Sequence, residues 1–220
     1  MSIQIISTED GSHSLKNTEL DETYHSVHGA IQESQHVFIG EGLDHFRAKG
    51  FKEVSIFEVG FGTGLNAFLT WLSSGPIRID YTAVEPFPIK EEVYSTLNYA
   101  ELLGQEVQLF QSLHSCEWNI QNKISDEFSL KKIAVKVEDA QLGSETYDLI
   151  YFDAFAPSKQ PEIWSIQVLD KTVKALKPGG ILVTYCARGQ FKRDLKALGL
   201  VVESLPGPPG KFEMVRARKE

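Results

Sequence analysis

The sequence predicts an α/β fold built on one largely parallel sheet of about seven strands, and three features support this prediction. Short apolar, strand-prone segments alternate along the chain with segments whose apolar residues repeat every three or four positions. Small or acidic residues follow several of these strands, at the edge where parallel sheets bind ligands. The 220 residues, of which 42% are hydrophobic, suffice for one domain with a sizeable core.

We expect a single domain over residues 1–220, with an N-terminal extension and hairpin over 1–50 and a core over 51–220. An insert that contains a hairpin is expected near 105–131, where polar residues interrupt the apolar pattern. The last two strands should form an antiparallel pair at the edge of the sheet. The predicted strands are 54–57, 77–84, 133–137, 147–153, 181–185, 200–205 and 212–217, and the predicted helices are 65–72, 88–103, 168–176 and 189–198.

Composition and charge disfavour several classes of protein. The chain shows neither a signal peptide nor an apolar run long enough for a membrane helix, so a cytoplasmic location is expected. Cys116 and Cys186 lie far apart and predict two reduced thiols. His25 and His28 have a spacing that could hold a metal, but no further ligand pattern completes a site, so none is expected. The formal net charge of −8 requires any contact with RNA to be local.

The most informative segment is the loop Glu58-Val59-Gly60-Phe61-Gly62-Thr63-Gly64, between a predicted strand and a predicted helix. Glycine permits a positive φ and close approach by a ligand. A dinucleotide fingerprint, G-x-G-x-x-G, would need glycine at position 65, which is leucine. The G-x-G-x-G spacing with an acid two residues ahead resembles motif I of methyltransferases that use S-adenosylmethionine (SAM). The residues expected to bind this cofactor here are Glu58, Gly60, Gly62, Gly64 and Asn66.

Acidic residues follow the next two predicted strands. Glu85 ends the second strand about 20 residues after the glycines, where a carboxylate accepts hydrogen bonds from ribose hydroxyls. The alternative is a solvated glutamate at a strand end. Asp139 and Ala140 follow the third strand, where they could bind the adenine amino group, although a simple loop acid fits the pattern nearly as well.

The fourth predicted strand supplies the expected catalytic residue. It ends at Asp153, which should face the same crevice as the glycine loop and Glu85. An alkyl amine has a pKa of about 10 and arrives protonated, so a carboxylate can orient it and take its proton. Phe155 is expected as a stacking wall, with the Ala156 carbonyl as an acceptor for the amine. The alternative for Asp153 is a helix N-cap.

Positive charge gathers toward the end of the chain. Between Arg188 and Glu220, eight basic residues face four acidic ones. This stretch is the one candidate surface for RNA, with ordinary solvated surface charge as the alternative. The basic residues are Arg188, Lys192, Arg193, Lys196, Lys211, Arg216, Arg218 and Lys219.

Three sets of residues form recognisable motifs: Thr23-Tyr24-His25-Ser26 through Glu33 to Ile39, Phe61-Gly62-Thr63-Gly64-Leu65-Asn66, and Asp153-Ala154-Phe155-Ala156-Pro157 with Pro161-Glu162-Ile163-Trp164. Together these segments resemble the methyltransferase domain of MnmC, the bacterial tRNA 5-methylaminomethyl-2-thiouridine methyltransferase family, in its standalone MnmD-like form. The resemblance implies a Rossmann-like SAM-dependent fold and N-methylation of the aminomethyl group of 5-aminomethyl-(2-thio)uridine at the tRNA wobble position. Asp153 matches the family's catalytic aspartate, and the segment from Tyr24 to Glu33 resembles a hairpin that lines the pocket. The residues expected to contact the substrate are Tyr24, Ser26, Glu33, Phe155, Pro157 and Lys211.

Two departures from the family pattern bear on partners. A flavin-dependent oxidase domain follows in the bifunctional members, whereas this sequence ends at Glu220. We therefore expect it to methylate only, with a separate enzyme supplying aminomethyluridine in tRNA. The family's loop before the last strand is usually more basic, and here Lys211 is its main cation.

Three alternatives to this function remain. An aminopropyltransferase of the spermidine-synthase type shares the fold, but such enzymes usually carry a second acid within the glycine loop, which this sequence lacks. Another small-amine N-methyltransferase would use the same site. A catalytically silent RNA-binding or SAM-sensing module would be expected to have lost the acids, yet Glu58, Glu85 and Asp153 are all present.

Overall fold

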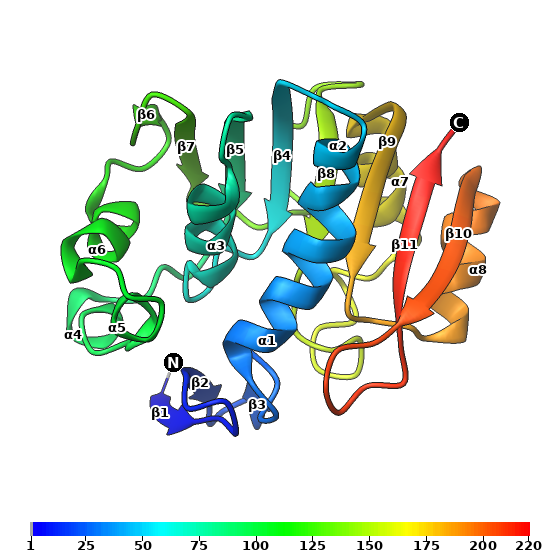
Figure 1. Cartoon of the computed structure of the whole chain (residues 1–220). Helices are drawn as coiled ribbons and strands as arrows, with labels where there is room; N and C mark the ends of the chain where they lie inside the picture. Colours follow the sequence, from blue (N-terminus) through cyan, green and yellow to red (C-terminus); the bar gives the residue numbers. More distant parts are fainter. Residues whose placement is uncertain (1) are drawn as a thin grey trace.

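The computed structural model describes residues 2–220 and contains a large sheet of eight strands with a small sheet of three (Figure 1). The strand order of the large sheet is β10-β11-β9-β8-β4-β5-β7-β6. Its strands are β4 (Glu53–Val59), β5 (Arg78–Val84), β6 (Gln121–Lys123), β7 (Phe128–Ile133), β8 (Tyr147–Phe152), β9 (Leu176–Thr184), β10 (Leu200–Pro206) and β11 (Glu213–Lys219).

The strand directions confirm a largely parallel sheet that ends in an antiparallel pair. Strand β4 runs parallel to β5 and β8, and these in turn run parallel to β7 and β9. Strand β11 runs antiparallel to both of its neighbours, β9 and β10. The eighth strand, β6, was not predicted as a separate member of the sheet; it pairs antiparallel with β7 at the other edge.

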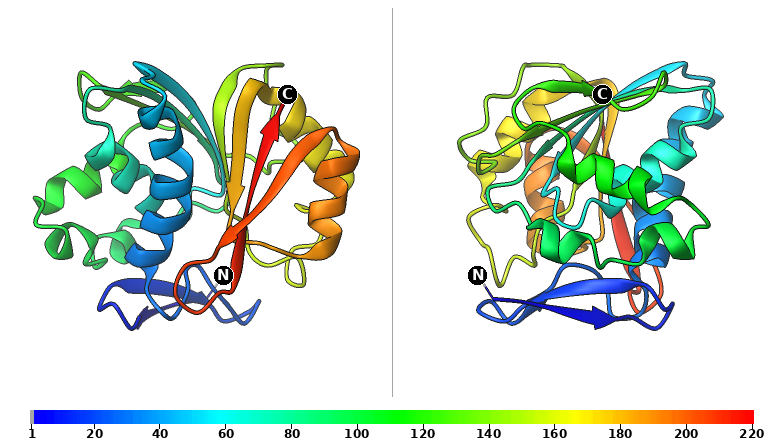
Figure 2. Two further views of the ribbon diagram at one scale, coloured as in Figure 1. Left: turned by 45° about the vertical axis from the view of Figure 1, so that its right-hand side comes forward. Right: turned by 90° about the vertical axis from the view of Figure 1, so that its left-hand side faces the viewer.

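Helices cover both faces of the large sheet, as a parallel sheet requires (Figure 2). Ile56 and Phe57 in β4 are both fully buried and belong to opposite core clusters, because successive side chains of a strand point to opposite faces. The first face is packed by α1 (Ala30–Ser34), the π-helical η1 (Gln35–Leu43), α2 (Asp44–Ala48) and α3 (Leu65–Ser73), and the second by α7 (Ile166–Ala175) and α8 (Gly189–Ala197). No helix within residues 2–220 combines the length and the apolar character of a membrane span.

The small sheet lies below the carboxyl ends of the parallel strands (Figure 1). It comprises β1 (Ile3–Ser7), β2 (His13–Asn17) and β3 (Glu22–Thr23), all antiparallel. The resemblance implied a hairpin over the segment from Tyr24 to Glu33. The hairpin of the extension in fact lies before that segment, within residues 3–23. That segment instead forms a loop and the start of α1, because Gly29 at φ 142° turns the chain into the helix.

The region between β5 and β8 departs from the prediction. The helix expected over 88–103 is broken into α4 (Glu91–Tyr94) and α5 (Tyr99–Leu102). The side chain of Asn98, at the break, accepts from the His13 amide at 2.8 Å and donates to the Gly11 carbonyl at 3.0 Å, so contacts with the small sheet replace helical bonds.

The expected insert near 105–131 begins with a helix, α6 (Val107–Ser115), before its hairpin. The third parallel strand covers 128–133 rather than 133–137. Its alternation was hidden because a lysine, Lys132, occupies a fully buried position in phase with Phe128 and Leu130. Because the strand ends at Ile133, residues 134–137 leave the sheet, and Lys136 and Val137 reach the cavity described below.

Candidate functional site

A cavity of about 300 Å³ opens at the carboxyl ends of β4, β5 and β8. Its walls come from the glycine loop, the ends of β5 and β8, the segment after β7 and the segment before α1. The structure brings together seven of the predicted site residues here: Tyr24, Gly60, Gly62, Asn66, Glu85, Asp153 and Phe155. The other predicted residues, Ser26, Glu33, Glu58, Gly64, Asp139, Ala140, Pro157 and Lys211, lie outside the cavity lining.

The three glycines of the loop occupy positions that disfavour a side chain. Gly60, Gly62 and Gly64 have φ values of 89°, 49° and 74°, which disfavour any residue with a Cβ. A Cβ on Gly60 would lie 2.6 Å from the backbone oxygen of Asp153, and one on Gly64 would lie 2.8 Å from the His114 ring. The Gly60 amide donates to the Val84 carbonyl at 3.1 Å, which fixes the loop to β5.

Glu85 holds the glycine loop from the next strand. Its two carboxylate oxygens accept from the Gly62 amide at 3.0 Å and from the Phe87 amide at 2.9 Å. Burial raises the pKa of Glu85, and these two hydrogen bonds oppose that shift. Phe87, which is 53% exposed, lines the cavity beside it. A carboxylate and an aromatic ring at this position can hold a ribose and an adenine.

The third strand contributes a different acid from the one expected. Lys136, Val137 and Glu138 line the cavity, whereas Asp139 and Ala140 lie in the turn that follows. The amides of Asp139 and Ala140 both donate to the Lys136 carbonyl at 3.0 Å. Because the strand ends earlier than predicted, the residue that reaches the cavity also shifts, from Asp139 to Glu138.

Asn66, in the first turn of α3, joins two carboxylates. Its Nδ2 donates to Oε1 of Glu58 at 2.9 Å and to Oδ2 of Asp153 at 2.8 Å. Glu58 is only 1% exposed, and burial raises its pKa well above the usual range for a carboxyl group. Glu58 therefore lies behind Asn66 instead of lining the cavity, and Asn66 fixes the orientation of Asp153.

Asp153 is the carboxyl group best suited to proton transfer. Burial, followed by the negative charge of Glu33, raises its pKa to about 7, while the Asn66 hydrogen bond and the positive charge of Lys211 act in the opposite direction. Asp153 therefore exchanges a proton near neutral pH, as an efficient general base should. The expected N-cap alternative does not apply, because Asp153 precedes a turn and the nearest helix, α7, is capped by Ser165.

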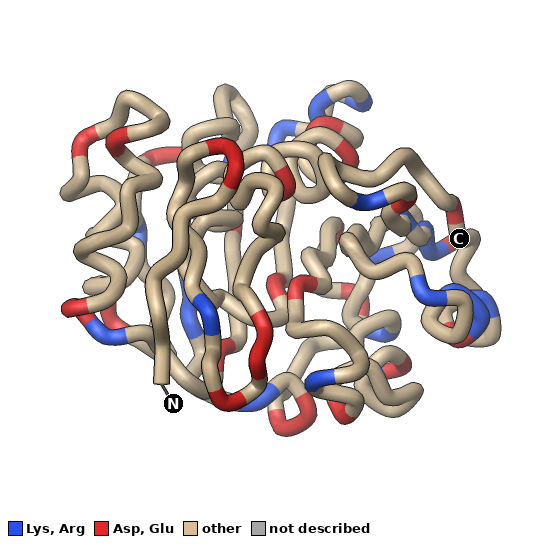
Figure 3. Tube along the Cα trace, turned by 90° about the horizontal axis from the view of Figure 1, so that it is seen from below, with Lys and Arg blue, Asp and Glu red and all other residues tan. Residues whose placement is uncertain are grey.

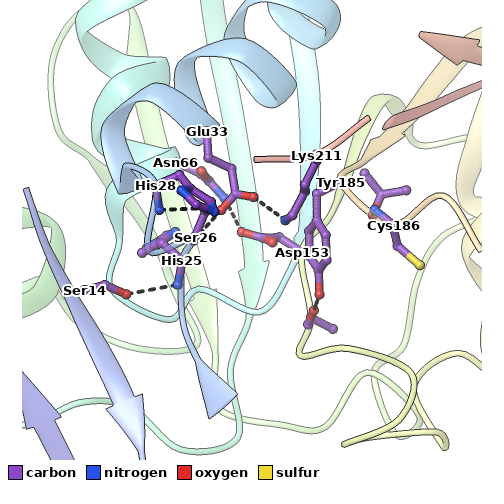
Figure 4. Close-up of polar contacts among 12 residues, drawn as sticks. Ser14, His25, Ser26, His28, Glu33, Asn66, Asp153, Tyr185, Cys186 and Lys211 are labelled. Carbon is purple, nitrogen blue, oxygen red and sulfur yellow. Dashed lines mark hydrogen bonds and ion pairs between the residues drawn. The ribbon is translucent and has the colours of Figure 1, made fainter. Parts of the chain in front are cut away.

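A charged cluster lies beside Asp153 and joins the two ends of the chain (Figure 4). Lys211 forms an ion pair with Glu33, which is 5% exposed and also accepts from the Ser26 amide at 2.8 Å. The Lys211 ammonium also sits 3.8 Å from the centre of the Tyr185 ring. Tyr185 was not predicted, because nothing in the sequence near residue 185 indicates that Lys211 packs on it.

Aromatic side chains form the wall next to Asp153. Tyr24 meets Phe155 edge to face, with ring centres 4.9 Å apart. Burial raises the pKa of Tyr24, so its hydroxyl stays protonated. The Ala156 carbonyl, expected to accept from an amine, instead accepts the amides of Lys159 and Gln160 at 2.8 and 3.1 Å. The Ala156 carbonyl is therefore already engaged within the chain, whereas the Asp153 carboxylate lines the cavity.

Two buried histidines that the sequence did not single out for this site support the glycine loop. His25 contacts the Thr63 hydroxyl at 2.6 Å, and His114 contacts the Thr63 carbonyl at 3.0 Å. Burial lowers the pKa of His25 to about 4 and that of His114 to about 3, so both are neutral. His28 contacts Glu9 instead, and no group of three potential metal ligands occurs within residues 2–220.

Comparison with known proteins identifies the family. The sequence profile of a family described as S-adenosyl-L-methionine-dependent methyltransferase matches residues 103–220, which is more than half of the chain. The chain belongs to this methyltransferase family. The predicted fold class and SAM as the cofactor are thereby confirmed.

Relatives of the methyltransferase confirm the resemblance to MnmC. A tRNA 5-methylaminomethyl-2-thiouridine biosynthesis bifunctional protein MnmC from Cupriavidus necator is 30% identical over 212 residues, which cover 90% of this chain and 32% of that protein. Its counterpart from Cupriavidus metallidurans is 31% identical, with 90% and 31% covered. The chain thus spans about a third of the length of these relatives. The crystal structure of MNMC2 from Aquifex aeolicus superposes with a TM-score of 0.81 at 25% identity, covering 100% of this chain and 70% of that one.

The residues present in the methyltransferase fit SAM. At Gly60 and Gly62 the glycine loop presents bare backbone to the cavity, and a Cβ on Gly62 would lie 3.3 Å from the Tyr24 ring at the cavity wall. The Glu85 carboxylate stands at the end of the second parallel strand, and Phe87, Val137 and Ile163 supply an apolar wall. The Glu85 carboxylate matches the polar ribose, and the apolar wall matches the face of adenine.

Most of the basic residues in the candidate RNA surface are already paired. Five of the eight cations between residues 188 and 220 form ion pairs: Lys192, Lys211, Arg216, Arg218 and Lys219. Within residues 2–220, Arg188, Arg193 and Lys196 are exposed and make no ion pair. Seen from below, basic residues gather on the right of the molecule, where α8 lies in Figure 1 (Figure 3). The surface available to an anionic partner is therefore α8 and the residue before it.

Proposed function

We propose that this methyltransferase transfers a methyl group to the aminomethyl nitrogen of 5-aminomethyl-(2-thio)uridine at the wobble position of tRNA, giving 5-methylaminomethyl-(2-thio)uridine. The observation that carries the proposal is Asp153, a buried carboxyl group with a pKa raised to about 7, beside the glycine loop and an aromatic wall. The relatives named for 5-methylaminomethyl-2-thiouridine biosynthesis support the choice of substrate.

The reaction requires a neutral amine in line with the transferred methyl group. When bound, SAM supplies the electrophilic methyl. The substrate amine has a pKa of about 10 and arrives as an ammonium ion. The Asp153 carboxylate accepts a hydrogen bond from it and then its proton, which leaves the nitrogen lone pair free. Because Asn66 holds Asp153 at 2.8 Å, the carboxylate keeps one orientation during this transfer.

The cofactor would lie along the glycine loop. In this arrangement Gly60 and Gly62 approach the methionine and ribose portions, and Glu85 accepts from the ribose hydroxyls. Glu138 lines the cavity and Asp139 does not, so Glu138 would be the acid available to the adenine amino group. Gly64 and Glu58 act from behind the cavity lining, Gly64 beside the His114 ring and Glu58 through its hydrogen bond from Asn66.

The substrate base would enter between Asp153 and the aromatic pair. Tyr24 and Phe155 form the wall against the ring, and Glu33 with Lys211 sets the charge around the amine. The whole chain acts as one unit in this arrangement, because residues 24–33 and Lys211 complete the site built on the sheet. We further propose that the chain works in the cytoplasm, where a separate enzyme supplies tRNA that carries aminomethyluridine.

Incubation with labelled SAM and tRNA from a strain that lacks this methylation tests the proposal. We expect the label to appear in 5-methylaminomethyl-(2-thio)uridine after digestion and mass spectrometry of the nucleosides. Putrescine or a protein extract in parallel reactions should stay unlabelled. Label in a polyamine or a protein, with aminomethyluridine left unchanged, would refute the assignment.

The charges around Asp153 predict opposite shifts in the pH dependence of activity. Glu33 raises the pKa of Asp153 and Lys211 lowers it. Activity requires the ionised carboxylate, so it increases as the pH rises through this pKa. Glu33→Gln should therefore move the profile of kcat/KM to lower pH, and Lys211→Met should move it to higher pH. Because the amine is the same in each reaction, shifts between variants report on Asp153.

The double variant Glu33→Gln/Lys211→Met provides the control for this prediction. Glu33 has the larger effect on the pKa of Asp153, so the double variant should titrate at a lower pH than the wild type. Identical profiles for all four proteins would show that Asp153 does not govern the rate.

A further inference from the structure

One large apolar side chain is almost completely exposed beside the site. Phe212 is 97% exposed, whereas the next most exposed large apolar side chain among the described residues, Phe87, reaches 53% and lines the cavity. Burial of a phenylalanine is strongly favourable, so a protein gains nothing for its own stability from this placement. An exposed aromatic ring next to a binding site is available for contact with a partner, and aromatic side chains are enriched among the residues that dominate such contacts.

The backbone around Phe212 is well fixed. The Gly207 amide donates to the Phe212 carbonyl at 3.2 Å, and the Lys211 amide donates to the Pro208 carbonyl at 2.9 Å. The two neighbouring side chains are also held, since Lys211 pairs with Glu33 and Glu213 pairs with Lys192 at 2.8 Å. The ring therefore projects from an ordered loop.

The position of Phe212 places it at the rim of the site. Lys211 points inward, toward Glu33 and Tyr185 beside Asp153 (Figure 4). Phe212 is the next residue along the chain, and its ring, which is 97% exposed, is directed to solvent. Gly210 packs against the His28 ring, which brings the loop next to Val27, itself 49% exposed.

Unpaired cations lie on the adjoining helix. The Lys192–Glu213 ion pair ties α8 to the residue that follows Phe212. Arg188, Arg193 and Lys196, the three cations of this region without an ion pair, are all exposed on α8 or directly before it. The exposed aromatic ring is thus adjacent in sequence to Lys211 at the site and to Glu213, which is paired with the helix that carries the unpaired cations. This combination suits single-stranded nucleic acid, whose bases stack on aromatic rings and whose phosphates bind cations.

We infer that Phe212 stacks on an unpaired base adjacent to the wobble uridine in the anticodon loop, while Arg188, Arg193 and Lys196 bind the neighbouring phosphates. This inference rests on the proposed function, because it assumes that the uridine enters the site from a tRNA loop. The stack holds the loop at the rim, and the modified uridine reaches Asp153. It also explains how a chain with a net charge of −8 binds RNA through a local surface.

The test uses an anticodon stem-loop that contains aminomethyluridine, with the fluorescent base 2-aminopurine at either neighbouring position. Stacking on an aromatic ring quenches this fluorophore. We expect quenching by the wild type and by Phe212→Trp at one of the two positions, and none by Phe212→Leu. The KM for the stem-loop should rise about 10- to 100-fold in Phe212→Leu, with kcat and SAM affinity unchanged. Ile120→Ala, at an apolar residue that is 45% exposed on the insert, should match the wild type.

The phosphate contacts have their own readout. Replacing Arg193 and Lys196 by glutamine should weaken binding of every stem-loop to a similar degree and reduce the salt dependence of the affinity by about two phosphate contacts. The 2-aminopurine quenching should persist at saturating RNA.

Two results would overturn the inference. Equal KM and equal quenching in the wild type and Phe212→Leu would exclude stacking. Loss of self-association in Phe212→Leu, measured by sedimentation, with RNA binding unchanged, would assign the ring to a protein contact. Failure of the proposed function can be distinguished from failure of this inference. In the first case the wild type would leave the stem-loop unmethylated. The quenching needs no turnover, so it would still decide whether Phe212 stacks.

Discussion

Replacement of Asp153 by asparagine is expected to lower kcat by about two to four orders of magnitude, the usual contribution of a general base. Asparagine keeps the size of the side chain and an oxygen that can accept from Asn66, which donates to Asp153 at 2.8 Å. It cannot take a proton from the substrate ammonium. The affinity for SAM should change little, because the glycine loop and Glu85 are untouched. Single-turnover methylation and calorimetric SAM binding measure the two effects separately.

Asp148→Asn is the matched control for this prediction. Asp148 lies at the opposite end of the same strand, where it accepts from the Ser55 amide and pairs with Lys177 at 2.8 and 2.9 Å. Its loss should cost about 1 kcal/mol of folding stability or less and leave kcat unchanged. If Asp153→Asn retained wild-type kcat, proton transfer would have to be assigned elsewhere.

A single methyl group added to the glycine loop should be nearly as damaging, through the fold as well as the cofactor. Gly60→Ala places a Cβ 2.6 Å from the backbone oxygen of Asp153 at a φ of 89°. Neither atom belongs to a flexible side chain, so the loop and the end of β8 must move apart. We expect a loss of about 2 to 4 kcal/mol in the free energy of unfolding, together with loss of measurable SAM binding. Thermal unfolding and calorimetry provide the measurements.

Gly179→Ala separates the two causes of this damage. Gly179 has a comparable φ of 77°, but a Cβ there would meet no atom within 4 Å. This variant therefore carries only the backbone strain, roughly 1 to 2 kcal/mol, and should bind SAM normally. Equal destabilisation of the two variants would show that the contact with Asp153 is unimportant.

The parallel core of the fold could be predicted because local patterns determine it. The apolar segments at β4, β5 and β8 are each followed by small or acidic residues, which defines both the strand and its ligand-binding end. The third strand could not be read in the same way, because Lys132 occupies a buried position that is normally apolar. The broken helix at Asn98 depends on hydrogen bonds to the distant small sheet, for which the local sequence carries no signal.

The residues of the candidate site also differ in how far the local sequence predicts them. Gly60, Glu85 and Asp153 could be located from their positions after strands. Lys211 and Glu33 were each named as contacts for the substrate, yet their pairing joins residues 178 positions apart, and no spacing rule predicts it. The shift from Asp139 to Glu138 is the direct result of placing a strand end four residues too late.

The ion pair between Glu33 and Lys211 also constrains how the site can be completed during synthesis. The ribosome makes Glu33 first, and 178 further positions separate it from the lysine that neutralises it. A nascent chain that has already folded β4 and β8 would hold the carboxyl groups of Glu33 and Asp153 near one another without a cation. Only when β11 inserts between β9 and β10 does the loop that carries Lys211 close over them. The cation that lowers the proton affinity of Asp153 is therefore made long after the carboxyl group of Glu33, which raises it.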